Sequence, residues 1–91
     1  MVETRILGPE YDTTLLAALK AVLRRLGAKL VRKDWDVAGS QEVSTADFMV
    51  RGEPLHVETE TYVGLSISGS SALLSEVADA LRSECAARKR R

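Results

Sequence analysis

The chain has 91 residues, of which 45% are hydrophobic, 29% charged and 4% aromatic, and its formal net charge is +0. This length is typical of one domain with one hydrophobic core, and the apolar share argues against wholesale disorder. One cysteine and one histidine exclude an internal disulfide, a cysteine-based zinc site and a multi-histidine metal site. There is no apolar run of membrane-spanning length and no signal-peptide core at the N-terminus, so we expect a cytoplasmic protein.

The first third of the chain predicts a strand followed by a helix. Apolar and charged side chains alternate over residues 2–6, which is typical of a short strand, and a Gly-Pro pair ends it. Leucine and valine then recur at helical spacing and predict a helix over 13–26. Asp12 or Thr13 is suited to cap its start, and Gly27 is suited to the left-handed residue after its end.

Beyond residue 28 the hydrophobic period changes to two, which indicates strands. Two strands are predicted, over 30–37 and 43–50, with a turn between them. A second turn leads into 55–68, where the odd-numbered positions are largely apolar and the even-numbered ones largely polar. This alternation predicts one buried and one wet face, and the segment is either one bent strand or two shorter ones. Ser70 and Ser71 then introduce a second helix.

The predicted order is therefore β-α-β-β-β-α, an α+β fold with an antiparallel-rich sheet and two helices packed on one face. Residues 1–87 are expected to form one domain, and the basic residues 88–91 a disordered tail. Trp35 is expected in the core because few aromatic side chains are present to fill it. Cys85 lies on the apolar stripe of the second helix and is expected to be a small buried hydrophobe.

The charges are segregated although the net charge is zero. Basic residues gather on the first helix and the start of the following strand, whereas acidic residues dominate from Asp34 to Glu60. Without the four basic residues at its end, the chain carries 9 basic and 13 acidic residues. An acidic body repels phosphate, so nucleic-acid binding through the first helix and the tail is disfavoured as a function.

The candidate binding surface is the even-numbered side of 55–68 together with its hairpin partner. The hairpin tip is expected at 52–53, which places Asp47 opposite Glu58. Met49 then opposes His56 on the same face. The predicted partner-binding face consists of Val43, Asp47, Met49, His56, Glu58, Glu60 and Tyr62.

Opposed carboxylates repel each other or attract a cation, so Asp47, His56 and Glu58 form an alternative small-ligand or metal-binding centre. On an extended strand, however, His56 and Glu60 lie about 13 Å apart and cannot ligate the same ion. The sequence therefore assigns no metal ligand and no cofactor.

Nucleophilic catalysis has little support in the sequence. Ser66 follows a glycine as in a nucleophile elbow, but His56 lies about 33 Å away along an extended chain. No catalytic residue is predicted. Backbone N–H groups near Ser70 and Ser71, at the start of the second helix, are a candidate anion site.

These patterns favour a small, non-enzymatic interaction module of the cytoplasm. It would bind a protein partner, or a second copy of itself as a homodimer, through an open sheet face or an edge strand. The small-ligand or metal-binding role is the first alternative, and nucleic-acid binding is the second.

Overall fold

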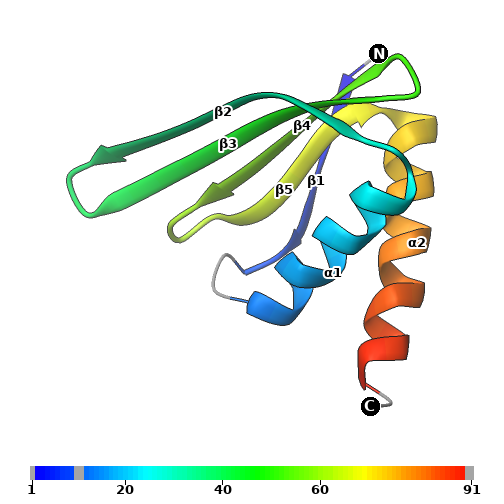
Figure 1. The fold of residues 1–91 in the computed structure, drawn as a ribbon. Coiled ribbons are helices and arrows are strands. Elements are labelled where there is room, and N and C mark those ends of the chain that lie inside the picture. The colour runs from blue at the N-terminus through cyan, green and yellow to red at the C-terminus, as the bar shows by residue number, and fades with distance from the viewer. Residues whose placement is uncertain (1, 10–11, 90–91) are drawn as a thin grey trace.

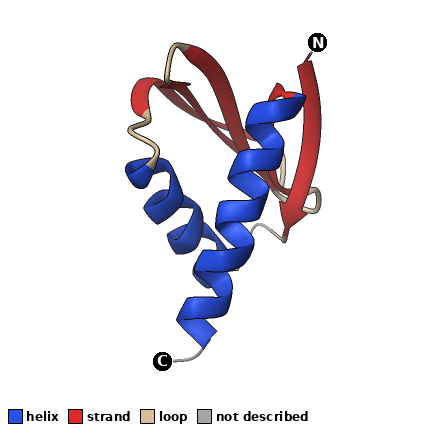
Figure 2. Cartoon of the chain, turned by 90° about the vertical axis from the view of Figure 1, so that its right-hand side faces the viewer, coloured by secondary structure: helices blue, strands red, loops and turns tan. Residues whose placement is uncertain are grey.

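The computed structural model describes residues 2–9 and 12–89, which form five strands and two helices. In chain order these elements are β1 (Val2–Gly8), α1 (Thr13–Arg25), β2 (Lys29–Ala38), β3 (Gln41–Val50), β4 (Glu53–Glu60), β5 (Gly64–Ser70) and α2 (Ser71–Lys89). The strands form one antiparallel sheet in the order β1-β5-β4-β3-β2 (Figure 1). Both helices lie on the same side of this sheet (Figure 2), which confirms the predicted α+β class.

Local signals fix both ends of α1 as predicted. The Leu15 backbone N–H donates to Asp12 Oδ1 at 2.9 Å, so Asp12 is the N-cap residue. At the other end Gly27 has a φ of +72°, and the Ala28 N–H donates to the Leu23 carbonyl at 2.9 Å. This is a Schellman motif, in which a left-handed glycine lets the last carbonyls find donors.

The alternating segment 55–68 forms two strands, which answers the question that the sequence left open. The chain turns between β4 and β5, where Tyr62 has a φ of +70° and Gly64 one of +118°. Val57 pairs with Ile67 across this hairpin, and odd-numbered residues face odd-numbered ones throughout. The turn therefore preserves the alternation, and all the odd-numbered apolar side chains of both strands remain on the helix side.

The core lies between the helix side of the sheet and the two helices. It contains the buried side chains of Ala18, Leu19, Val22, Leu23, Val50, Leu55, Val57, Leu65, Ile67, Leu73, Leu74, Val77 and Leu81. α2 packs against β5, β1 and α1, whereas α1 packs chiefly against α2. As a result, α2 covers the β1–β5 half of the sheet more closely than α1 covers the other half.

β2 is one edge of the sheet, and the described side chains along it, residues 29–37, are all exposed. The prediction that Trp35 is a core residue is wrong, because its exposed fraction is 65%. Trp35 does point to the helix side, since it pairs with Ser44, which in turn opposes Thr59. The end of the β2–β3 hairpin extends beyond both helices (Figure 1), and most of this indole is left uncovered.

α2 continues to Lys89, two residues into the segment predicted as a tail, while Arg90 and Arg91 lie outside the described residues. Arg88 Nε donates to Glu84 Oε2 at 3.1 Å, one helical turn earlier. Cys85 is half-buried against the core rather than fully enclosed. Among the described helices, none combines the length and the apolar character that a membrane span requires.

Candidate functional site

The open face of the sheet, opposite the helices, carries a polar row that crosses all five strands. From β2 to β1 this row consists of Arg32, Asp47, His56, Ser68 and Thr4. Asp47 opposes His56, so the prediction that it opposes Glu58 is wrong. The turn is formed by Arg51 and Gly52, one residue earlier than predicted, and both have positive φ values of 51° and 82°.

The observed β3–β4 register differs from the predicted one by two positions. Every strand residue therefore remains on its predicted side of the sheet. The strand positions that point to the open face include Val43, Asp47, Met49, His56, Glu58 and Glu60. Tyr62 lies in the β4–β5 turn, beyond the paired positions of both strands, and its side chain is 78% exposed. The six strand residues of the predicted face therefore share one side of the sheet.

The imidazole of His56 lies between two carboxylates. Its Nδ1 is 2.6 Å from Asp47 Oδ1, and its Nε2 is 3.8 Å from Glu58 Oε1. A carboxylate accepts hydrogen bonds, so Nδ1 carries a proton in the shorter contact. Within residues 2–9 and 12–89, no group of three metal-ligating side chains converges on a common point. The contacts describe a polar surface cluster in which the hydrogen bond between His56 and Asp47 links β4 to β3.

The serines on this face are not arranged for nucleophilic catalysis. Ser66 is only 8% exposed and opposes Glu58 rather than His56. Ser68 does oppose His56, but its Oγ forms a hydrogen bond of 2.8 Å with Thr4 Oγ1. A nucleophile needs a base within hydrogen-bond reach, and the described contacts of these two serines supply none.

Ser70 is the N-cap of α2, and its hydroxyl both accepts and donates a hydrogen bond within the chain. Its Oγ accepts the Leu73 N–H at 3.2 Å and donates to Glu53 Oε1 at 2.9 Å. The predicted anion site at Ser70 and Ser71 therefore has a carboxylate of the same chain beside it. A neighbouring negative charge opposes the binding of a further anion at this helix start.

One exposed ion pair ties the β3–β4 turn to α2. The Arg51 guanidinium donates to Glu76 Oε1. This hydrogen bond is the main cause that lowers the pKa of Glu76 and raises that of Arg51. The pair anchors the turn, and it lies on the helix side rather than on the predicted face.

The most unusual surface is one that the sequence analysis did not single out. β2 exposes four large apolar side chains, with exposed fractions of 56% for Leu30, 64% for Val31, 65% for Trp35 and 45% for Val37. The ladder with β3 is irregular between Leu30 and Arg32, which leaves Val31 without a partner residue. Beyond this bulge the alternation resumes, so Leu30, Trp35 and Val37 all lie on the helix side of an edge strand.

A groove of about 300 Å³ adjoins this edge on the helix side. Its walls are provided by α1 and by the inner face of β2, β3 and β4. They include Leu16, Leu19, Lys20, Leu23, Leu30, Lys33, Ala46, Phe48 and Val57. The groove is predominantly apolar. It is present because α1 packs against α2 more closely than against the sheet.

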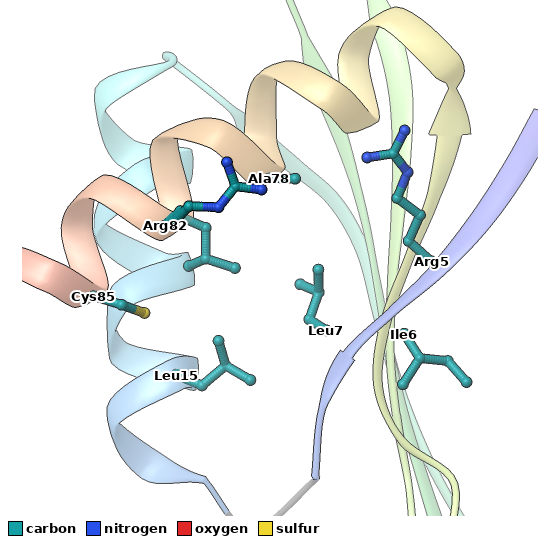
Figure 3. A pocket seen from close by; sticks show the side chains of 8 residues that line it. Arg5, Ile6, Leu7, Leu15, Ala78, Arg82 and Cys85 are labelled. Atoms are coloured by element: carbon teal, nitrogen blue, oxygen red, sulfur yellow. The ribbon is translucent and has the colours of Figure 1, made fainter.

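A second depression, of about 340 Å³, lies between β1 and the helices (Figure 3). Leu7, Leu15 and Cys85 line it, together with the arginines Arg5 and Arg82. Both guanidiniums already have partners. Arg5 donates to the Ser75 hydroxyl at 3.1 Å, and Arg82 lies 3.5 Å from an Asp79 carboxylate oxygen. The depression is thus a crevice between β1 and the helices, in which each arginine has a polar contact within the chain.

Comparison of the chain with protein-family models, with curated proteins and with solved structures gave no match. The functional argument therefore depends on the surfaces described above.

Proposed function

We propose that the protein is an interaction module that binds a protein chain along the edge strand β2. The observation that carries the proposal is the exposure of β2 over residues 29–37, which leaves the large apolar side chains of Leu30, Val31, Trp35 and Val37 uncovered. An exposed sheet edge with large apolar side chains is a template for another strand, and the charged residues and the bulge of β2 restrict which strands can pair with it.

The mode of binding is strand addition. An incoming strand would satisfy the outward N–H and C=O groups of β2, and its alternate side chains would contact the two faces. On the helix side these contacts reach Trp35 and the groove next to Leu30 and Lys33. An isolated tryptophan on an open surface is a typical interface anchor. The open face around His56 is the weaker candidate, because its charged groups are paired with one another.

Photo-cross-linking tests this proposal. A benzoylphenylalanine placed at Val37, in β2, is compared with one at Val2, which is 74% exposed on the opposite edge of the sheet. The full chain is irradiated in nuclease-treated cytosolic extract, the compartment expected from the sequence. We expect adducts to a protein, or to a second copy of the chain, from position 37 and not from position 2. Trp35→Ala should reduce them at least about tenfold.

Two results would contradict the proposal. The first is the absence of any adduct from position 37, and the second is an identical set of adducts from both positions. Because Trp35 and Val37 are exposed, the altered chains are expected to keep their fold. Circular dichroism of each variant checks this directly.

A further inference from the structure

We propose that β2 pairs with β2 of a second copy of this chain, antiparallel, about a two-fold axis at Asp34. The inference rests on the proposed function, in which β2 is the binding edge, and names the partner. Its basis is the order of charges along the strand, together with the side of the sheet to which each β2 side chain points.

The two halves of β2 carry opposite charges. Lys29, Arg32 and Lys33 occupy the first half, and Asp34 and Asp36 occupy the second. When two copies align in parallel, like charges face each other. When they align antiparallel, the basic half of each copy faces the acidic half of the other. This order of charges is unfavourable for pairing with an edge strand of arbitrary sequence. It is favourable for antiparallel pairing with β2 of a second copy.

Face matching restricts the register of the pairing. Beyond the bulge at Val31, Lys33 and Trp35 point to the helix side, whereas Arg32, Asp34 and Asp36 point to the open face. In a continuous antiparallel sheet, directly opposed residues share a face. The two-fold axis must therefore pass through a residue position and not between two residues.

The charges of the opposed side chains then determine which position of the two-fold axis is favourable. An axis at Trp35 sets Asp34 opposite Asp36 twice, which is repulsive. An axis at Lys33 sets Arg32 opposite Asp34 twice, but it also brings two ammonium groups together beside the apolar groove, where no carboxylate of the groove lining offsets them. An axis at Asp34 sets Arg32 opposite Asp36 of the second copy, twice by symmetry. The two central Asp34 carboxylates are tolerated, because each is already bound by Arg32 of its own chain, with Nε 2.7 Å from Oδ2.

The same register covers the exposed tryptophan. Trp35 of one copy lies opposite Lys33 of the other, and Lys33 lines the groove together with Leu30. A tryptophan ring packs well on a lysine side chain, through its alkyl stem and through the attraction between ammonium and ring. Each copy thus places its exposed indole at the mouth of the other copy's groove.

The experiment measures association of the full chain and its rescue by charge exchange. Light scattering after chromatography, from about 1 µM to about 1 mM, should give a mass that rises from 9.9 kDa towards twice that value. Trp35 is the only tryptophan, so its emission should shift to the blue over the same range. R32D should weaken association at least about tenfold, because it sets a second carboxylate against Asp36.

The double variant R32D/D36R restores opposite charges, and its guanidinium at position 36 lies two residues from Asp34 on the open face, as that of Arg32 does in wild type. It should regain association to within about threefold of wild type. R82D is the matched control, since the Arg82 side chain is 81% exposed and lies on α2, away from β2. It should associate as wild type does. D36R alone leaves the Arg32–Asp34 ion pair in place but sets two guanidiniums opposite each other, so it should weaken association as R32D does. Weakening by both single variants and recovery in the double variant together report contact between copies.

A chain that remains at 9.9 kDa throughout refutes self-pairing. A double variant no better than R32D refutes the proposed register. The proposed function is judged separately: a monomeric chain that still forms adducts with another protein from position 37 keeps β2 as a binding edge. A monomeric chain without such adducts refutes both.

Discussion

The sharpest structural prediction concerns Gly64, at the start of β5. Its φ of +118° lies in a region that side-chain-bearing residues rarely adopt. The backbone of β1 also passes very close to it. A Cβ at position 64 would stand 2.4 Å from the Gly8 carbonyl oxygen and 3.6 Å from Ile6 Cγ2. Gly64→Ala therefore imposes two separate costs on the native state.

The conformational cost of an alanine at this φ is about 1–3 kcal/mol. To relieve the contact, the end of β1 must move by about 1 Å, which loosens the pairing of Gly8 with Leu65 and adds a similar amount. The expected total is about 2–6 kcal/mol. This is a large part of the roughly 5–14 kcal/mol that stabilises a chain of this length.

Urea denaturation followed by circular dichroism measures this loss, and the melting temperature should fall by about 8 °C or more. Gly52→Ala is the matched control. Gly52 also has a positive φ, of +82°, in a hairpin, but a Cβ there meets nothing within 4 Å. It should cost only about 1–2 kcal/mol. If the two variants lose equal stability, the close approach of the Gly8 carbonyl to Gly64 is refuted.

Two further predictions test the core and the ion pair between the β3–β4 turn and α2. Leu19 is 1% exposed, so Leu19→Ala should cost about 2–5 kcal/mol in urea denaturation. Leu30→Ala, at a position 56% exposed, should cost less than about 1 kcal/mol, and equal losses would contradict the assigned core. Because the pKa of Glu76 is lowered from 4.5, its contribution is fully present above that pH and is lost as pH falls through the lowered pKa. Glu76→Gln should therefore melt slightly below wild type at neutral pH and together with it in strong acid, and a pH-independent difference would argue against the Arg51 contact.

Features set by local chemistry were predictable from the sequence. The period of the α1 leucines, the cap at Asp12 and the left-handed Gly27 are all decided within a few residues of chain. The side of the sheet to which His56 and its acidic neighbours point was also predictable, because strict alternation determines it.

The positions of the turns were not predictable from the alternation of apolar and polar residues. The β4–β5 turn preserves the odd-even pattern, so nothing in the spacing marks it apart from Gly64. The β3–β4 register predicted and the register found differ by two positions, and both satisfy the same pattern. The turn determines which of the two registers forms, and in it Arg51 adopts a φ of +51°. Arginine rarely adopts a positive φ, so the residue type does not predict a turn at this position.

The exposure of Trp35 depends on lengths that a hydrophobic pattern does not contain. At 1.5 Å per residue, the 13-residue α1 is about 20 Å long. At about 3.3 Å per residue, the 10-residue β2 extends about 33 Å. The helix therefore cannot cover the whole strand, and the apolar side chains near the hairpin tip are left outside the core.

Hydrogen–deuterium exchange read amide by amide tests the role of β2 most directly. Outward N–H groups of an unoccupied edge exchange rapidly, and pairing with another strand protects them. With rising concentration, or with the partner captured from position 37, we predict slower exchange in β2 over residues 29–37, while the opposite edge β1 keeps its rate. Unchanged exchange in β2 while a partner is bound elsewhere on the molecule would contradict the account.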